Sequence, residues 1–412
     1  MTVSCGSCGA ELVPVLSLGD QPLANALLTE ETLADPEPRF PLTLAVCPVC
    51  GLVQITDPVP PEQMFREYAY FSSVSEAFVE HARIIATRMI AARHLTGDSL
   101  VIEIASNDGY LLQHYAAAGI PVLGIDPARN VAAAAMARGV PTVAEFFDPN
   151  LARQLLASGQ SADVVHANNV IAHVTDLDGF VTGIGSILKP DGVAVIETPY
   201  VRELVERLEF DTIYHEHRYY HSLSALERIL DRRGLAVAGV ERLPVHGGSL
   251  RIFVRHREAI GVETDDLSPS AVAVILAEER ALGITTPGYY LDFAARVDAL
   301  GRDLLALLDG LRRDGRSIAA YGAAAKGTVL LNAFGIGIAT IDFVADRSPY
   351  KQGRYMPGVC VPIVPAERLV ETMPDVCLLL AWNFADEILA QQTEYRERGG
   401  RFLIPIPDPK LV

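Results

Sequence analysis

The sequence has no run of ~18 apolar residues, the length that a membrane-spanning helix needs. Its first residues, Met1 to Cys5, lack a basic region followed by an apolar stretch, so we expect no secretory signal there. Basic residues are few, since 34 Lys and Arg stand against 51 Asp and Glu, which gives a net charge of −17. Strong binding to nucleic acids or to membranes is therefore not expected. Because the sequence shows neither a long apolar run nor a signal pattern, we expect the protein in the cytoplasm.

Only six cysteines are present, and because disulfides are rare in the cytoplasm these residues need another explanation. Four of them form two pairs, Cys5-x-x-Cys8 and Cys47-x-x-Cys50, and a glycine follows each pair. Four thiolates suit a tetrahedral Zn²⁺ ion with no open position, so the pairs predict a structural zinc site. The alternative is four unrelated buried thiols. A redox role is disfavoured because neither pair lies between a strand and a helix.

A chain of 412 residues is too long for one ordinary core, which favours several domains. We expect a zinc-binding domain over residues 1–66, a second domain over residues 67–255 and a third over residues 256–412. From about residue 75 onward, helical patterns alternate with short apolar strands, as in parallel sheets covered on both faces. The predicted fold class is α/β: a doubly wound Rossmann-like core, a small N-terminal zinc-binding domain and a second, C-terminal α/β domain.

Two acids fall at the carboxyl ends of predicted strands, where ligands bind in such sheets: Glu103 and, about 20 residues later, Asp126. An acid after the second strand can accept the ribose hydroxyls of a nucleoside. The turn between these acids has one glycine, Gly109, and is therefore a poor cradle for a dinucleotide pyrophosphate. Together with a turn expected at residues 188–192, before a strand beginning at Gly192, the pattern favours a cofactor without phosphates, such as S-adenosylmethionine (SAM). The alternative is that both acids are ordinary strand-end polar residues.

Two aromatic residues, Phe146 and Phe147, follow the predicted third strand-to-helix position. Their rings are placed either to flank the adenine of the cofactor or to join the core, and the sequence leaves both roles open.

Several segments together resemble the SAM-dependent sugar C-methyltransferases of antibiotic deoxysugar pathways, which act on nucleoside-diphosphate 4-keto-6-deoxysugars. The Tyr-His-Glu-His run at residues 214–217 and the Trp-Asn-Phe run at residues 382–384 are the specific ones. The other matching segments are the paired Cys-x-x-Cys and residues 103–112, 168–174, 214–226, 246–251, 321–332 and 380–384.

The resemblance implies a carbon nucleophile made by taking a proton from the carbon next to a ketone, a step that needs a base with a pKa near neutrality. It implies His217 as that base, with Tyr214 and Glu216 beside it to hold the sugar. Further residues are expected to complete the site: His173 from the sheet, and Tyr68 and Tyr70 from the segment after the zinc domain.

The matching segments also cover the SAM contacts expected at Glu103, Ala105, Ser106, Asn107, Gly109 and Asn168. Asp126, at the end of the second predicted strand, is the expected ribose contact, and Phe146 and Phe147 are the candidate adenine contacts. In the C-terminal third, a predicted strand ends at Tyr321 and the turn Gly322 to Gly327 follows, a pattern that can bind phosphate through backbone N–H groups. The resemblance implies that this domain holds the nucleotide end of the substrate. Arg251 and Lys326 are the candidate diphosphate contacts, and solvated surface charge is the alternative for each.

The expected enzyme is a SAM-dependent C-methyltransferase that acts next to the 4-keto group of a thymidine-diphosphate (dTDP) 4-keto-6-deoxysugar, with C3 favoured. Its cofactors would be SAM and a structural Zn²⁺ ion. Its expected partner is the ketosugar substrate, without nucleic acid or membrane, and we expect a monomer. The alternatives are methylation of a sugar oxygen or nitrogen and, in another class, an NAD-dependent oxidoreductase that uses the C-terminal turn. A zinc-ribbon nucleic-acid binder is disfavoured by the net charge.

Overall fold

The computed structural model describes residues 3–65, 71–260 and 269–412. Its first sheet forms around the two cysteine pairs, where apolar residues alternate with polar ones. The strand order is β1-β2-β3-β9, and every neighbouring pair is antiparallel. Its strands are β1 (Val13–Pro22), β2 (Arg39–Val46), β3 (Val53–Ile55) and β9 (Tyr219–Tyr220). Because β9 comes from the middle of the chain, the N-terminal residues complete this sheet only with a strand of the next domain.

The second sheet has seven strands in the order β10-β11-β8-β7-β4-β5-β6. The strands from β8 to β6 pair in parallel, whereas β11 runs antiparallel to both of its neighbours. The strand order reverses between β4 and β7, and in such sheets ligands bind at the carboxyl ends of the strands beside that point. The strands are β4 (Val101–Ile104), β5 (Val122–Ile125), β6 (Thr142–Val143), β7 (Ala162–Asn168), β8 (Leu188–Pro199), β10 (Leu235–Leu243) and β11 (Ser249–His256).

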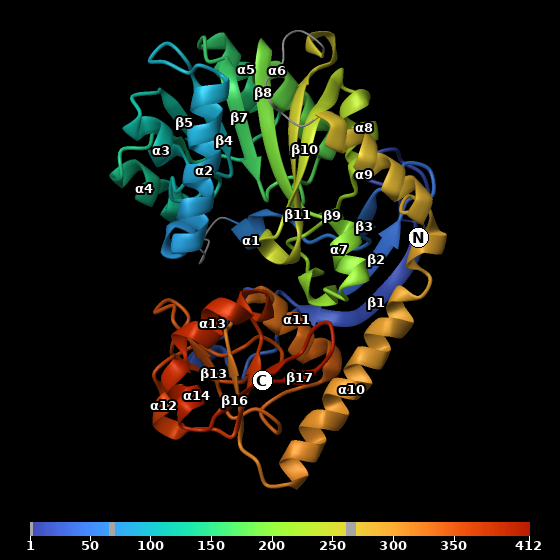
Figure 1. Ribbon diagram of the computed structural model, residues 1–412, viewed down its shortest axis with the longest axis vertical. Coiled ribbons are helices and arrows are strands. Elements are labelled where there is room, and N and C mark those ends of the chain that lie inside the picture. The colour runs from blue at the N-terminus through green and yellow to red at the C-terminus, as the bar shows by residue number, and fades with distance from the viewer. Residues whose placement is uncertain (1–2, 66–70, 261–268) are drawn as a thin grey trace.

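Helices cover both faces of this sheet (Figure 1). Helix α2 (Glu76–Ala92) begins where the Ser75 hydroxyl accepts the Phe78 N–H, and its buried residues follow helical spacing. It packs with α3 in the apolar cluster on one face of the sheet, whereas α6 and α8 join the cluster on the opposite face. The helices are α3 (Leu112–Ala117), α4 (Arg129–Ala137), α5 (Pro149–Ala157), α6 (Leu177–Ile187), α7 (Val201–Glu206) and α8 (Leu223–Asp231).

The segment 188–192 differs from the sequence prediction, which placed a turn there and began the strand at Gly192. Strand β8 already begins at Leu188, which pairs with Ala162. The register then shifts, and regular pairing resumes between Val193 and Val164. The segment is therefore an irregularity within the strand, because its backbone remains paired with β7 at both ends.

The third sheet has six strands in the order β14-β13-β12-β15-β16-β17, and only the last pair is antiparallel. Its strands are β12 (Ile318–Tyr321), β13 (Val344–Asp346), β14 (Ile363–Pro365), β15 (Val376–Leu379), β16 (Arg401–Ile404) and β17 (Lys410–Leu411). The associated helices are α11 (Ala325–Phe334), α12 (Arg368–Thr372), α13 (Ala385–Gln391) and α14 (Thr393–Glu397). The predicted second α/β domain is thus present.

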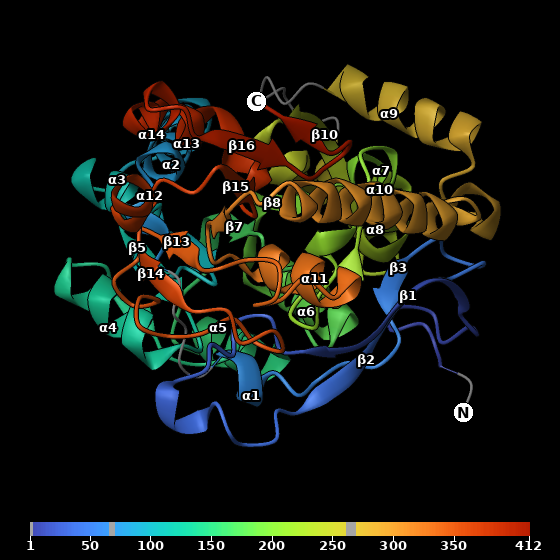
Figure 2. The same ribbon diagram turned by 90° about the horizontal axis from the view of Figure 1, so that it is seen from below.

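Helices α9 (Pro269–Leu282) and α10 (Phe293–Arg313) connect the second and third sheets. In Figure 1 the central domain occupies the upper half, the C-terminal domain the lower half, and β1 and β2 pass between them. Figure 2 shows the same arrangement from below, with α10 along the side of the C-terminal domain. One apolar cluster includes buried residues of all three sheets, which joins the parts of the chain through a common core.

The remaining elements are short. They are α1 (Glu62–Phe65) and the 3₁₀ turns η1 (Glu30–Thr32), η2 (Ser72–Val74), η3 (Phe210–Thr212), η4 (Val245–Gly247), η5 (Arg257–Ala259), η6 (Pro287–Tyr290) and η7 (Trp382–Phe384). Among the described residues, no helix combines the length and the apolar character that crossing a membrane requires.

Candidate functional site

The two cysteine pairs converge at the edge of the first sheet. The sulfur atoms of Cys5, Cys8, Cys47 and Cys50 all lie within 4.8 Å of one another. The sulfurs of Cys5 and Cys50 are 3.5 Å apart, and those of Cys8 and Cys47 are 3.4 Å apart. Four convergent thiols without a further type of ligand fit one tetrahedral Zn²⁺ ion, as the sequence predicts.

Both pairs use the same turn. The N–H of Gly9 donates to the Cys5 carbonyl and the N–H of Gly51 donates to the Cys47 carbonyl, each over 2.9 Å. The φ angles of these glycines are 74° and 75°, in the left-handed region that glycine adopts most readily. The glycine after each pair therefore turns the backbone so that both thiols face the same point.

The turn that follows β4 is held by an acid from the neighbouring strand. Asp126, directly after β5, accepts the backbone N–H of Asn107 through Oδ2 and that of Ala128 through Oδ1, each over 2.9 Å. Burial raises the pKa of Asp126 to about 6. The turn is compact, since Ala105, Asn107 and Gly109 all have positive φ angles. Asp126 thus lies beside the turn at the carboxyl edge of the sheet, where a ribose would be held.

Glu103 is the most unusual acid of this region. It is fully buried in β4, and neither of its carboxyl oxygens has a hydrogen-bond partner among the described residues. Burial raises its pKa well above the usual value, and Asp126, Asp108 and Glu197 act in the same direction. A buried carboxyl among other acids calls for a cation. SAM carries both a sulfonium and an ammonium group, so this donor set fits the expected cofactor.

Residues outside the turn after β4 hold the side chains of Asn107 and Asp108 in place. The backbone N–H of Ser72 donates to Asn107 Oδ1 over 2.9 Å, and the hydroxyl of Ser73 donates to Asp108 Oδ2 over 2.5 Å. Asp108 also forms an ion pair with Arg138 at 2.8 Å. The segment before α2 therefore closes over the turn. The buried hydroxyl of Ser106 and the side-chain oxygen of Asn168, at the end of β7, have no hydrogen-bond partner in the described part of the chain.

The two phenylalanines take different positions. Phe147 packs edge-on against Phe180 of α6, with ring centroids 5.8 Å apart, and a Cβ on Gly183 would lie only 2.8 Å from the Phe147 ring. This packing favours the core role for Phe147. Phe146 is half-buried beside it, so its role as an adenine contact stays a prediction.

The Tyr-His-Glu-His run lies between η3 and β9, and its second histidine is held at both ring nitrogens. Nδ1 of His217 lies 2.9 Å from the Thr212 carbonyl oxygen, and Nε2 lies 2.8 Å from the Tyr214 hydroxyl. Because a carbonyl oxygen only accepts, Nδ1 carries a proton, and in the neutral imidazole Nε2 then presents its lone pair to the hydroxyl. For the neutral ring, the contacts thus select the tautomer in which Nε2 is basic.

His173 lies against this ring, with the two imidazole centroids 4.9 Å apart. Burial lowers the pKa of His173 to about 4, so it is neutral at physiological pH. It follows β7 closely, and the Arg218 N–H, next to the run, donates to the carbonyl of Ala172 over 2.7 Å. The run is thereby attached to the segment after β7, at the same edge of the sheet as the cofactor turn.

Glu216, buried to 5% exposure, is contacted by a residue that the sequence did not suggest. Asn25 donates from Nδ2 to Glu216 Oε1 over 2.5 Å, although 191 positions separate the two residues. No local pattern marks Asn25, since the surrounding segment has neither strand nor helix periodicity. Tyr68 and Tyr70, the other predicted site residues, lie outside the described residues.

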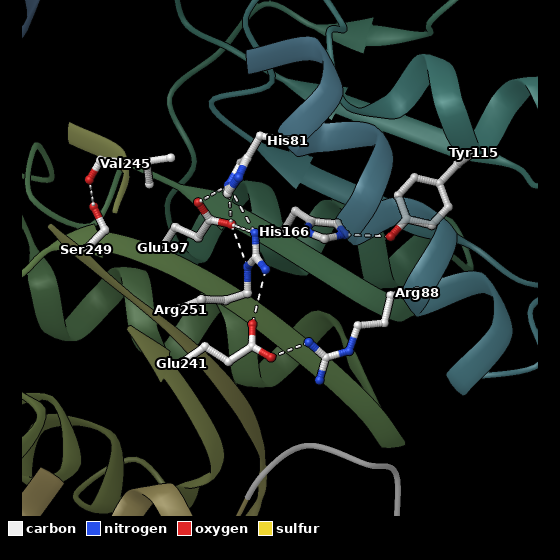
Figure 3. A network of polar contacts seen from close by, with 9 residues as sticks. All are labelled: His81, Arg88, Tyr115, His166, Glu197, Glu241, Val245, Ser249 and Arg251. Atoms are coloured by element: carbon white, nitrogen blue, oxygen red, sulfur yellow. Dashed lines mark hydrogen bonds and ion pairs between the residues drawn. The ribbon is translucent and has the colours of Figure 1, made fainter. Parts of the chain in front are cut away.

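The prediction for Arg251 is wrong, because its guanidinium is an internal counterion (Figure 3). Arg251 lies in β11 with a side-chain exposure of 5%, and its Nε donates to Glu197 of β8 over 2.6 Å. Its Nη1 donates to Glu241 of β10 over 3.1 Å, and His81 of α2 lies 2.9 Å from Glu197. Arg88 of α2 pairs with Glu241 as well. The register of three strands places these charges in one row, so Arg251 neutralises carboxylates inside the protein and does not face a diphosphate.

Lys326 is the second residue of α11, at the junction of the central and C-terminal domains. Its ammonium lies 4.6 Å from the centroid of the Trp382 ring, and Trp382 donates from Nε1 to Asp211 Oδ2 over 2.7 Å. Burial lowers the pKa of Lys326, while Asp211 and Glu209 oppose that shift. Burial raises the pKa of Asp211 to about 6 and that of Glu209 to about 7. The Lys326 amine is thus held between acids of the central domain and Trp382 of the C-terminal domain.

Three family models match successive parts of the chain: a zinc binding domain over residues 5–65, a methyltransferase domain over residues 67–239 and a C-methyltransferase C-terminal domain over residues 244–407. The C-methyltransferase NovU of Streptomyces niveus is 37% identical over 409 residues, which cover 99% of this chain and 96% of that protein.

Other similarities are partial. A ubiquinone biosynthesis O-methyltransferase of Rhodopseudomonas palustris is 31% identical over 99 residues, which cover 24% of this chain and 39% of that protein. Among solved structures, magnesium protoporphyrin IX methyltransferase from Synechocystis PCC 6803 with bound SAM matches with a TM-score of 0.34 and 17% identity, covering 43% of this chain and 79% of that one.

Proposed function

The chain belongs to the SAM-dependent C-methyltransferase family with an N-terminal zinc-binding domain, and from this premise we propose that it methylates a nucleotide-linked ketosugar. The acceptor is the carbon next to the 4-keto group of a dTDP-4-keto-6-deoxysugar, with C3 favoured, in the deoxysugar pathway of a secondary metabolite. Full-length similarity to NovU supports C-methylation. The observation that carries the chemistry is the pair of hydrogen bonds at His217, which make Nε2, beside the Tyr214 hydroxyl, the basic nitrogen of the neutral ring.

A carbon nucleophile requires that a proton leave the carbon next to the ketone. His217 Nε2 takes this proton, and the electron pair of the C–H bond becomes the double bond of an enolate. The general base must be neutral before this step, and the Thr212 carbonyl keeps it in the right tautomer by accepting the Nδ1 proton.

Negative charge then grows on the ketone oxygen, where a positioned donor stabilises the transition state. The Tyr214 hydroxyl, 2.8 Å from Nε2, is such a donor. In the reaction it turns to the enolate oxygen and leaves Nε2 open to the carbon acid. Glu216, next to His217 in the chain, and His173, whose ring lies against that of His217, hold the sugar hydroxyls.

Bound SAM would supply the methyl group, with a thioether as the leaving group. Asp126 would hold its ribose, and Glu103 would stabilise its positive charge. The enolate carbon would take the methyl group as the thioether leaves, and the protonated His217 then returns its proton to solvent. The C-terminal domain holds the nucleotide end of the substrate, and Lys326 is its candidate diphosphate contact.

The test replaces the base. His217→Gln and His217→Ala are compared with His94→Gln, an exposed histidine outside the site. Loss of a general base lowers the rate about 10²- to 10⁴-fold, so methyl transfer and solvent deuterium exchange at the sugar carbon should both fall by that factor. Exchange that stays fast in both His217 variants would show that another group takes the proton.

The substrate is tested with a panel of dTDP-ketosugars and labelled methyl donor, and the labelled atom is located by NMR. Label on a ring carbon next to the ketone is expected. An enzyme that methylates an oxygen or nitrogen would instead still accept a sugar whose 4-keto group has been reduced. A C-methyltransferase would not, because reduction removes the acidity of the neighbouring C–H bond.

A further inference from the structure

The segment between the two cysteine pairs leaves the first sheet as soon as β1 ends. Residues 23–29, here called the strap, begin with a tight turn in which the N–H of Ala26 donates to the Leu23 carbonyl over 3.1 Å. Asn25 lies at the tip of this turn and is exposed. The turn thus projects one amide side chain away from the zinc domain.

The strap contacts both of the other domains within five residues. On the central domain, Asn25 donates to Glu216 over 2.5 Å. On the C-terminal domain, the Thr328 hydroxyl of α11 donates to the Ala24 carbonyl over 2.9 Å. Leu28 and Tyr355 then exchange two backbone hydrogen bonds of 3.0 Å and 2.9 Å. The residues on either side of Asn25 are therefore anchored to a domain that does not contain Glu216.

A second set of contacts fixes the far end of the same connection. The Gly358 N–H donates to Glu37 Oε2 over 2.6 Å, and Arg39 donates to the Gly358 carbonyl over 3.2 Å. The chain thus returns to β2 with both ends held against the C-terminal domain. Such a doubly anchored segment fixes the amide of Asn25 far better than a free loop would.

The fixed position of the Asn25 amide affects Glu216, the residue to which it donates. Glu216 is nearly buried and immediately precedes His217 in the chain. Because the proposed function gives its carboxylate the task of holding the sugar, the orientation of that carboxylate decides how the sugar lies against the base. A hydrogen bond to a carboxylate is among the stronger ones in proteins, and it restricts the side chain to one orientation.

We propose that the strap is a positioning element for the methyl-transfer site and that Asn25 is the positioning residue through which it fixes Glu216. This inference rests on the proposed function, because it assigns a role in the same site. The zinc domain then serves catalysis by presenting Asn25, and the C-terminal domain shares in that placement through Thr328 and Tyr355.

The test is a double-mutant cycle with Asn25→Ala, Glu216→Gln and the double variant, measured as kcat and KM for the ketosugar and for SAM. If Asn25 acts through Glu216, each single change lowers kcat roughly tenfold, and the double variant is no slower than Glu216→Gln alone. KM for SAM, zinc content and melting temperature should stay at the wild-type values in Asn25→Ala. Losses that multiply in the double variant would overturn the proposal.

Two further variants sharpen the result. Asn25→Asp keeps the size of the side chain but replaces the donor with a second carboxylate, so it should lower kcat more than Asn25→Ala does. Thr328→Val removes the anchor at Ala24 and should lower kcat a few-fold in the same direction. Glu30, an exposed residue just beyond the strap, provides the matched control. Glu30→Gln should leave kcat and KM at the wild-type values.

The two levels of the proposal fail in different ways. A wild-type enzyme that methylates none of the ketosugars defeats the proposed function. A wild-type enzyme that turns over normally, together with an equally active Asn25→Asp variant, defeats the strap's role alone.

Discussion

The central and C-terminal sheets each carry a strand–turn–helix that an aspartate from the neighbouring strand closes. In the central sheet, Asp126 accepts the N–H of Asn107 in the turn after β4 and that of Ala128, two residues after itself. In the C-terminal sheet, Asp346 accepts the N–H of Ala323 in the turn after β12 and that of Ser348, again two residues after itself, each over 2.7 Å. The same arrangement, an aspartate that accepts two backbone N–H groups beside a strand–turn–helix, thus occurs in both domains.

The charges around the two turns differ. The central turn is lined by Glu103, Asp108 and Asp126, of which Glu103 has no hydrogen-bond partner among the described residues. The C-terminal turn instead carries two lysines: Lys326 is the second residue of α11, and Lys351 donates to the Ala323 carbonyl over 2.8 Å. The same backbone geometry is therefore surrounded by acids in the central domain and by lysines in the C-terminal domain, which agrees with the proposed division between a cationic cofactor and an anionic nucleotide.

Replacing the two aspartates tests most directly whether the two turns bind different ligands. Asp126→Ala removes both the turn contact and the proposed ribose acceptor, so SAM should bind roughly 100-fold more weakly, or about 2.7 kcal/mol. Asp346→Ala should leave SAM affinity unchanged and raise KM for the nucleotide sugar. Calorimetric titration of SAM measures the first effect. Equal loss of SAM affinity in both variants would show that the two turns do not divide the ligands.

The glycines that open the turns offer the next largest effect. Gly322 has a φ of +89°, and a Cβ there would lie 2.7 Å from the Ala381 Cβ, with the Ala381 backbone nitrogen at 3.3 Å. Gly322→Ala should therefore lower the free energy of unfolding by about 2 to 3 kcal/mol.

Two matched glycines serve as comparisons in the same thermal unfolding experiment. Gly109 has a φ of +80°, and its Cβ would meet a side-chain methyl of Val140 at 3.0 Å, so Gly109→Ala should cost somewhat less. Gly119, with a φ of +76° and nothing within 4 Å, should show only the backbone strain of about 1 kcal/mol. A Gly322 variant as stable as the Gly119 variant would mean that Ala381 moves aside freely.

A smaller effect is expected at Lys326. Lys326→Gln should raise KM for the nucleotide sugar roughly tenfold without changing SAM affinity, because it removes one cation from the pocket assigned to the diphosphate. Initial rates at varied sugar concentration check this. Lys351→Gln, which removes the other lysine of this turn, is the companion variant. An unchanged KM in both would place the diphosphate elsewhere.

The smallest expected effect is a pH dependence of SAM affinity. Burial holds the pKa of Glu103 well above its usual value, so folding favours the protonated acid. Its contribution to stability is therefore full below the unfolded-state pKa and is lost as pH rises through the folded-state pKa. SAM, as a cation, favours the carboxylate, so its affinity should rise a few-fold with pH over that range. Titrations at several pH values should show a flatter dependence in Glu103→Gln.

The sequence predicts those features that depend on residues close together in the chain. The repeated Cys-x-x-Cys-Gly pattern gives each half of the zinc site, and the four thiols do converge. The alternation of short apolar strands with helices likewise predicts the central sheet, which the structure confirms. In each case the signal is a local spacing, either two residues between ligands or the period of a strand or helix.

What the sequence did not predict depends on contacts between distant segments. Arg251 is expected at a diphosphate because its segment resembles the family, yet the pairing of β11 between β8 and β10 buries it against Glu197. Asn25 reaches Glu216 only because three domains assemble around the strap. Neither contact can be predicted from the spacing of residues along the chain. The first depends on which strands become neighbours, and the second depends on how the domains assemble.

The place of β9 in the first sheet has a practical consequence for anyone who wishes to shorten this enzyme. Tyr219 and Tyr220 pair with β3, and their exposures are only 1% and 4%. An excised fragment that begins after the zinc domain would present them to water as a bare sheet edge, which invites aggregation. A graft of the cofactor-binding half onto another scaffold must therefore bring β1, β2 and β3 with it.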